Sequence, residues 1–442
     1  MKIHKDLGYL LTKNKLVEQF FPRTLFIAAT ICVVLGTPGC ATYSAGFAKV
    51  ESATANRDLN GAIKSLDELK LSGADEALHY LNKGTLLRLQ ENYSESNKYF
   101  EHAKNLQEKL AAISASEQLA SVSVNDTMKA YEGLPSEQLM LYSFEALNYL
   151  QMGAIDDAAV EARQFDIKQT LIAKKNGNAK YLSGAFVRYL NSMAYEAVGE
   201  RDSARIEMNK ALEGYKAQNS SFGIPPSVIA DVARLEARKP PSSEAVFILH
   251  NGLGPSLDEF TIRVANPNPQ NGSAFLSLAI PKFSKRSVPV TRITLSEGSD
   301  SVSSEIVADI NDIAERSLND RIPAITARAV ARMVVKNVAA KSAKDQTKDA
   351  GAFGLLMSVA ADIGTAVSER ADTRTWSLLP GNINMARLPL PAGKHNLLAT
   401  YYGTNNNIIG TREFKDVIVK SGQKTFISDY YLNQPLAAKA PQ

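Results

Sequence analysis

Few side chains in this sequence could do covalent or acid–base chemistry. Both cysteines, Cys32 and Cys40, lie within the first 40 residues, so nothing beyond them can supply a disulfide, a thiolate nucleophile or a cysteine-ligated metal site. Ser421 and Lys424 have a Ser-x-x-Lys spacing, but that chemistry needs the serine at a helix start, and here a turn between strands is expected. The later histidines show no HExxH or His-x-His spacing; they are His79, His102, His250 and His395. We therefore expect no enzymatic activity, no metal and no cofactor.

The segment around the only tryptophan is a candidate for recognition rather than catalysis. It reads Ala-Asp-Thr-Arg-Thr-Trp over 371–376, so that Asp372 and Arg374 stand beside Trp376. Trp and Arg dominate binding hot spots, and the segment therefore predicts an exposed interaction surface. The competing interpretation is that Trp376 fills the core while Asp372 and Arg374 form a local ion pair.

A basic stripe precedes this segment. Arg321, Arg328, Arg332 and Lys336 follow one another at helical spacing. The stripe, with Arg328 and Arg332 as its candidate interaction residues, predicts either a patch that meets anionic lipid headgroups or an acidic partner, or a solvated helix face.

Cys40 is the residue whose chemistry we expect to be used, through lipidation. Arg23 is the last charge before an uncharged apolar run, 24–39, which follows a basic segment and has the form of a secretory leader. The run is too short and too interrupted for a confident membrane span, which needs about 20 apolar residues. Gly39 before Cys40 resembles the site at which bacterial lipoproteins receive a diacylglyceryl thioether and are cleaved, although Thr37 and Pro38 replace the residues usual there. The alternatives are an ordinary signal peptide and a short apolar anchor.

Lipidation would decide where the chain resides. A multiply acylated Cys40 is a firm membrane anchor, because each buried methylene contributes about 0.8 kcal/mol. The residue after Cys40 is Ala41. In enteric-type bacteria an aspartate at that position would favour the inner membrane, so its absence favours the periplasmic face of the outer membrane. We therefore expect a signal peptide over 1–39, a tether over 40–58 and a lipid-anchored outer-membrane protein.

Length and charge restrict the remaining possibilities. The 442 residues have room for two or three domains, and 22% charged with 45% hydrophobic residues is ordinary for a globular protein. The formal charge of +4 includes a leader balance of +3, which leaves +1 for the mature chain. So small a charge gives no electrostatic reason to expect nucleic acid as a partner.

The region 59–238 is expected to be an all-α domain of tetratricopeptide-like repeats. Small residues would let paired helices approach closely while Tyr, Leu and Phe fill the space to the next pair. Gly153 and Gly199 mark turns within two such units. Because the spacing is irregular, an amphipathic helical bundle is the alternative. Repeats of this kind present a concave surface that typically holds a protein partner.

The region 244–432 is expected to be a β-sandwich-like α+β domain with a helical insertion over 301–370, followed by a tail over 433–442. Its first and last strands should share sheets, although two separate domains are the alternative. In the insertion, Ile306, Ile310, Ile313 and Leu318 would form one helical face, and Pro323 would restart the helix in a new direction. A polar break is expected over 341–349. The apolar, glycine-containing segment 350–367 is expected to be a buried helix, an oligomer contact or a membrane-associated segment. Apolar or alternating runs between turn residues predict strands over 245–250, 260–265, 274–280, 290–295, 385–390, 396–402, 407–413, 414–419 and 425–431.

The order of these features resembles one family. A lipoprotein cysteine is followed by helices containing ALNYLQMGAIDDAAVEAR and GERDSAR, and then by FILHNGLGP, IPAITARAVAR, ADTRTWSLLP and LPAGKH. This order resembles an uncharacterised proteobacterial family of tetratricopeptide-repeat-containing outer-membrane lipoproteins. The resemblance implies no catalytic residues, and it suggests a cell-wall or envelope-assembly context.

These observations together predict a non-enzymatic scaffold. We expect an outer-membrane lipoprotein that faces the periplasm and binds periplasmic or outer-membrane protein partners in envelope or cell-wall assembly. The alternative is a structural subunit of a ring-like outer-membrane complex for secretion or motility, which would make the chain a homo-oligomer.

Overall fold

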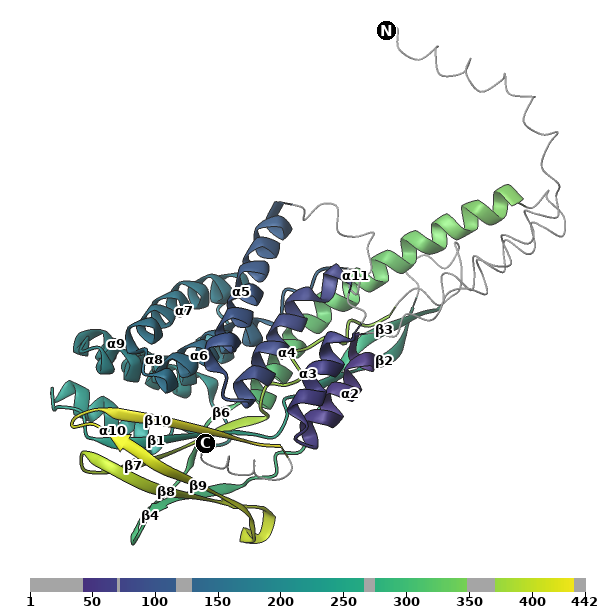
Figure 1. The fold of residues 1–442 in the computed structure, drawn as a ribbon. Coiled ribbons are helices and arrows are strands. Elements are labelled where there is room, and N and C mark those ends of the chain that lie inside the picture. The colour runs from purple at the N-terminus through teal and green to yellow at the C-terminus, as the bar shows by residue number, and fades with distance from the viewer. Residues whose placement is uncertain (1–42, 70–71, 117–128, 266–274, 348–369, 433–442) are drawn as a thin grey trace. The chain divides into compact units, whose positions relative to one another are not determined.

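Helices form the first part of the described chain and strands most of the second part (Figure 1). The computed structural model describes residues 43–69, 72–116, 129–265, 275–347 and 370–432. The described residues from Phe47 onward belong to one compact unit, and the chain is of mixed α+β class. Cys40, the predicted leader over 1–39, the segment 350–367 and the residues 433–442 lie outside the described residues.

The helical part consists of consecutive helices joined by short connections. Among the described helices, none is long and apolar enough to cross a membrane. The helices are α2 (Tyr43–Ala55), α3 (Leu59–Asp67), α4 (Glu76–Leu89), α5 (Tyr93–Ser116), α6 (Pro135–Met152), α7 (Ile155–Lys175), α8 (Ala185–Ala197), α9 (Arg201–Gln218) and α10 (Pro226–Glu236), with short 3₁₀ turns η1 (Gly73–Asp75) and η3 (Lys180–Ser183).

Three helix pairs pack as hairpins: α4 with α5, α6 with α7, and α8 with α9. The predicted turn glycines lie where the chain reverses. Gly153 caps the end of α6 with a φ of +74°, and Gly199 follows α8 with a φ of +83°. Glycine reaches this left-handed conformation without the steric cost that a Cβ imposes.

Small residues bring the paired helices together. A Cβ on Gly84 would lie 2.6 Å from the ring of Phe100, so only glycine fits there without a shift. The hydroxyl of Ser96 on α5 donates to the Gly84 carbonyl on α4 at 2.7 Å, and that of Ser192 on α8 donates to the Ala204 carbonyl on α9, also at 2.7 Å. These small residues are therefore sites of close helix contact.

The strands form two four-stranded sheets and one two-stranded sheet. Their orders are β10-β1-β7-β6, β5-β4-β8-β9 and β2-β3. Strand β1 pairs in parallel with β10, so the first and last strands of this region share a sheet, as the sequence predicts. The bounds are β1 (Glu244–Asn251), β2 (Ser256–Ala265), β3 (Phe275–Ser284), β4 (Arg292–Glu297), β5 (Asp300–Ser303), β6 (Glu305–Asp309), β7 (Asn382–Pro389), β8 (Gly393–Tyr402), β9 (Ile408–Val419) and β10 (Lys424–Tyr431), with a 3₁₀ turn η6 (Thr404–Asn406) before β9.

One buried apolar cluster joins the two larger sheets. Phe247 on β1 and Leu388 on β7 belong to the same cluster as Leu295 on β4 and Tyr401 on β8. The rings of Phe247 and Tyr401 lie 6.5 Å apart between their centroids. The buried sides of both sheets therefore face a common core.

The region 301–370 differs from the predicted helical insertion at its start. Strands β5 and β6 occupy 300–309, and the helix α11 (Ile310–Thr347) begins only at Ile310. Ile306 is therefore in a strand, where it pairs with Asn384 of β7. Pairing with a distant strand decides this segment, and its local apolar spacing does not reveal that partner.

Pro323 does not restart the helix. The polar break predicted over 341–349 is also wrong for its described part, because residues 341–347 are helical. Helix α11 runs continuously through Pro323. A proline inside a helix has no N–H to donate to the carbonyl oxygen four residues earlier. Here that carbonyl belongs to Asn319, and both Asn319 and Pro323 are exposed to solvent. Water can therefore satisfy the carbonyl.

The two strands predicted over 407–413 and 414–419 form one continuous strand, β9.

Candidate functional site

Four of the five predicted interaction residues line one cleft. Arg328, Arg332, Asp372 and Arg374 come together around a cavity of about 240 Å³. The same cavity is lined by three further basic residues: Lys129, Arg321 and Arg370. Residues more than 40 positions apart in the sequence thus contribute to one site, which we call the basic cleft.

Three segments and a small sheet position the basic cleft. Arg321, Arg328 and Arg332 lie on α11 at separations of seven and four residues, which places them along one side of a helix. Helix α11 packs on β3 through Ala329 and Leu278, both buried. The segments 129–134 and 370–374 supply the rest of the basic rim. Apolar side chains from α11 and the small sheet also line the cavity: Leu257, Ala279, Pro281, Leu318 and Ile325.

Arg374 is held by the protein itself. Its guanidinium donates to both carboxylate oxygens of Asp372, at 2.8 and 2.7 Å, and to Asp75 at 3.1 Å. It also donates to the carbonyl oxygens of Ala74 and Lys129, at 3.0 and 2.9 Å. Burial would lower the pKa of Arg374, but the hydrogen bonds and charges of Asp372 and Asp75 outweigh it and raise that pKa. Arg374 and Asp372 form the local pair considered above, and they fix the shape of one wall.

Trp376 does not reach the basic cleft. Its side chain is 0% exposed, which is incompatible with an exposed recognition role and fits the packing role considered beside it. The indole N–H donates to the hydroxyl of Thr85 on α4 at 2.9 Å, and the ring packs edge-on against Phe100 and Phe144. Its backbone N–H donates to Glu137 on α6 at 2.8 Å. Trp376 therefore fastens the segment after α11 to the helices.

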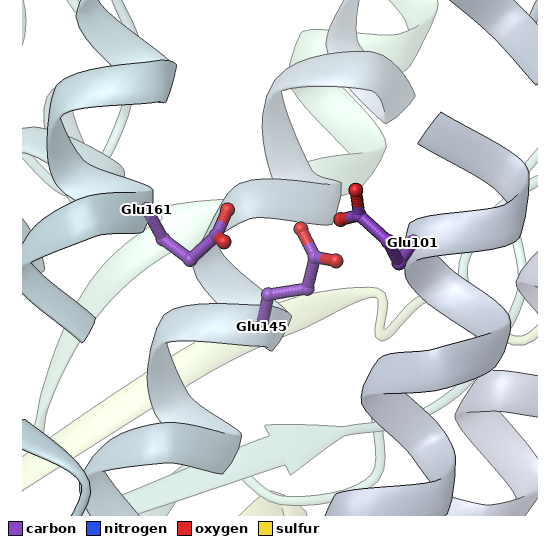
Figure 2. Close-up of side chains that lie close together, drawn as sticks. All are labelled: Glu101, Glu145 and Glu161. Atoms are coloured by element: carbon purple, nitrogen blue, oxygen red, sulfur yellow. The ribbon is translucent and has the colours of Figure 1, made fainter. Parts of the chain in front are cut away.

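A second cluster of titratable groups lies between the helices and was not predicted. Figure 2 shows Glu101, Glu145 and Glu161 on three helices with their carboxylates turned toward one another. One carboxylate oxygen of each lies within 4.8 Å of the others. The ammonium of Lys104 contacts all three, at 2.6 Å from Glu101 and 3.1 Å from each of Glu145 and Glu161. The spacing of these carboxylates suits a divalent cation, but the lysine supplies the positive charge, so the arrangement is that of a buried ion-pair network.

The network perturbs its own protonation. Burial raises the pKa of Glu145 well above its usual value of 4.5, and the neighbouring Glu161 carboxylate adds to this effect. Burial likewise raises the pKa of Glu161, against the opposing charge of Lys104. No sequence motif links these residues; only the facing of helices α5, α6 and α7 brings them together.

Helices of two of the pairs contact strands that follow later in the chain. Tyr215 on α9 donates to the Val307 carbonyl on β6 at 2.7 Å, and Gln151 on α6 donates to Ser428 on β10 at 2.7 Å. Lys424 on β10 contacts Glu196 on α8. Parts of these helices are therefore covered by strands of the same chain.

Exposed aliphatic side chains gather instead on α7. Val160 is 42%, Ile167 66% and Leu171 61% exposed. Their separations of seven and four residues align them along one side of the helix. We call these three residues the α7 row. An exposed apolar patch can mark a contact surface, which makes the α7 row a candidate for one.

Comparison with known proteins gives little to add. No protein-family model matches the sequence, and no curated protein matches it. Among solved structures, a crystal structure of the apo form of RapI matches with a TM-score of 0.34 and 14% sequence identity, covering 49% of this chain and 54% of RapI. The match thus spans about half of each protein, and a TM-score of that size does not establish a common fold.

Proposed function

We propose that the chain is a non-enzymatic scaffold that holds partner proteins at the periplasmic face of the outer membrane, anchored through acyl chains on Cys40. The proposal includes the tetratricopeptide-like character of the helix pairs, the β-sandwich-like character of the later region and the likeness to envelope lipoproteins. The observation that carries it is the α7 row, since exposed aliphatic side chains in line on one helix offer binding surface without chemistry.

The exposed helix sides indicate where a partner protein would bind. A partner bound to the sides of α6, α8 and α9 that contact β6 and β10 would compete with those strands. The outer face of α7 has no such competitor among the described segments. Partner proteins are therefore expected to bind on the α7 row.

Replacing Ile167 and Leu171 together with serine should reduce recovery of partner proteins at least tenfold. Burial of each aliphatic side chain at an interface contributes about 1.5–3 kcal/mol, and 1.4 kcal/mol corresponds to tenfold in affinity. The measurement is crosslinking in intact cells, followed by quantitative mass spectrometry of the captured proteins. The matched control replaces Ile229 and Ile408, which are 54% and 62% exposed, and should leave recovery unchanged. Equal recovery from both double variants would contradict a role for the α7 row.

The anchor makes a separate prediction. Changing Cys40 to serine removes the thiol that would carry the acyl chains, so acylation and the cleavage that follows it should both be lost, and the leader should remain on the chain. Mass spectrometry of the amino-terminal peptide of the unaltered protein should show acylation at Cys40. An unmodified or uncleaved amino terminus would remove the anchor from the proposal while leaving the α7 row to be judged separately.

A further inference from the structure

We infer that the protein partner held on the α7 row also places a carboxylate side chain in a hollow at the C-terminal end of that row. The hollow has a volume of about 200 Å³, and Leu171 of the α7 row is one of its lining residues. We call it the lysine hollow, because Lys168 and Lys175 of α7 line it as well. The inference rests on the proposed function, since it adds a charged contact to the apolar contact proposed for the same partner.

The lysine hollow continues the α7 row along one side of the helix. Lys168 precedes Leu171 by three residues and Lys175 follows it by four, and residues at these separations are neighbours on a helix surface. With a rise of about 1.5 Å per residue, Val160 and Leu171 lie roughly 16 Å apart along the helix axis. A partner segment that covers the α7 row therefore reaches the lysine hollow at the end of its apolar contact.

Two other parts of the chain complete the lysine hollow. Glu132 and Gln138 line it from the start of α6 and the residues before it, and Arg321 lines it from α11. The side-chain amide of Gln138 donates to the carbonyl oxygens of Glu132 and Gly133, at 2.9 and 3.3 Å. One wall of the hollow is therefore held in place by hydrogen bonds within the chain.

The charges of the lysine hollow are complementary to a carboxylate. Its lining holds three cationic side chains and one carboxylate, Glu132, which lies 3.8 Å from the ammonium of Lys175. Lys168 is half-buried, and among the described residues no carboxylate forms an ion pair with it. Burial lowers the pKa of Lys168 and the charge of Lys175 adds to this, against the opposing charges of Glu108 and Glu132. A carboxylate that enters the hollow would stabilise the ammonium of Lys168.

The surroundings of the lysine hollow favour an acidic side chain of a protein as the occupant. A volume of about 200 Å³ accommodates one such side chain, and Leu171 and Ile172 make part of the lining aliphatic. A lysine ammonium is a compact charge that a single carboxylate can meet. A protein segment supplies aliphatic side chains for the α7 row and an aspartate or glutamate for the hollow from one surface.

Affinity capture of the full chain from freshly disrupted cells, with quantitative mass spectrometry, tests the inference. The proteins to follow are those whose recovery falls when Ile167 and Leu171 are replaced with serine. Lys168→Gln combined with Lys175→Gln should lower their recovery about tenfold, an effect typical of losing a charge-assisted contact. Lys168→Arg combined with Lys175→Arg keeps both charges and should leave recovery within about twofold, which an effect of folding alone would not distinguish by charge.

The matched control removes two charges from elsewhere on the surface. The side chains of Lys64 and Lys415 are 77% and 66% exposed, and their joint replacement with glutamine should change recovery less than about twofold, because exposed ion pairs contribute little.

A second measurement uses the unaltered protein and so does not depend on how a variant folds. A water-soluble carbodiimide joins a lysine amine to a carboxylate in direct contact as an amide, while the reagent takes up the elements of water and becomes a urea. Mass spectrometry should find Lys168 or Lys175 joined to an aspartate or glutamate of a captured partner, and in the arginine variant these links should be absent.

The outcomes separate this inference from the proposed function. If the serine variant loses the partners and the glutamine variant keeps them, the α7 row stands and the inference is overturned. If both variants keep them, the proposed role of the α7 row fails together with the inference. Equal loss in the glutamine and arginine variants also overturns the inference, because charge would not then be what the partner recognises. Carbodiimide links from Lys168 or Lys175 only to a second copy of this chain overturn it as well, since the surface would then serve self-association.

Discussion

Replacing Trp376 with alanine is expected to lower the free energy of unfolding by about 3–5 kcal/mol, the range found for removing a large aromatic side chain from a core. The indole is 0% exposed and lies with its ring centroid 5.7 Å from Phe100 and 5.4 Å from Phe144. Its removal leaves a cavity that these rings cannot fill, because Phe100 is already pressed against Gly84.

The loss should come from packing more than from one hydrogen bond. Trp376→Phe keeps an aromatic ring but loses the bond from the indole N–H to Thr85, and should therefore cost less than Trp376→Ala, about 1–3 kcal/mol. Phe260→Ala serves as the control because Phe260 is 48% exposed, and its effect should be small. Since Trp376 is the only tryptophan, urea unfolding should be followed by far-ultraviolet circular dichroism rather than by fluorescence. A Trp376→Ala variant as stable as the unaltered protein would contradict the packing role.

The sequence allowed the helix pairs to be predicted because their signals are local. Gly153 and Gly199 end or follow helices, where a left-handed backbone favours glycine, and Gly84 with Ser96 gives close helix contact. Most predicted strands also appear, because apolar runs between turn residues describe them without reference to distant partners. These features depend on neighbours within about one hairpin.

The same local reasoning failed where distant partners decide the outcome. Ile306 has helical spacing to Ile310 and Ile313, yet pairing of β6 with β7 places it in a strand. Glu137 accepts hydrogen bonds from the backbone of Trp376 and the hydroxyl of Thr375, more than 230 residues away. Neither contact has a sequence signature, since only the folded chain brings these residues together.

For the candidate site, some features were predictable from neighbouring residues and others depended on distant contacts. Helical spacing alone predicted that Arg328 and Arg332 share a helix side, and adjacency alone suggested that Asp372 pairs with Arg374. That all four line one cavity depends on how α11 lies beside 370–374, which spacing does not reveal. The buried ion-pair network around Lys104 was missed for the same reason, because its members come from three separate helices.

Replacing Lys104 with methionine is expected to destabilise the protein by about 3–5 kcal/mol near pH 8, the range for breaking a buried ion pair by removing one partner. Lys104 is 4% exposed, and Glu145 and Glu161 beside it are 2% and 5% exposed. Methionine preserves much of the side-chain volume but leaves two buried carboxylates without a positive charge. Lys98→Met is the matched control: Lys98 pairs with Glu95 on the same helix but is largely exposed, and its loss should have little effect.

The destabilisation by Lys104→Met should grow with pH. Burial already raises the pKa of Glu145 and of Glu161 above the usual value of 4.5, and loss of Lys104 removes the charge that opposes this rise. The folded state then binds more protons than the unfolded state at every pH from about 4.5 up to the raised pKa values, so stability falls as pH rises through that interval. Urea unfolding at pH 5 and pH 8 should show the smaller loss at pH 5. A loss of equal size at both values would mean that packing, not charge, explains it.

A second substitution separates the two causes within one protein. If uncompensated charge destabilises Lys104→Met, adding Glu145→Gln should restore part of the lost stability at pH 8, because the amide replaces a buried carboxylate and carries no charge to desolvate. The same Glu145→Gln change in the presence of Lys104 should instead destabilise, since it removes a partner at 3.1 Å from the ammonium. Opposite signs in the two backgrounds would measure the coupling directly. An effect of Glu145→Gln that is equal in sign and size in the two backgrounds would show that Lys104 and Glu145 contribute independently, and the three carboxylates would then have to be stabilised by something other than the lysine between them.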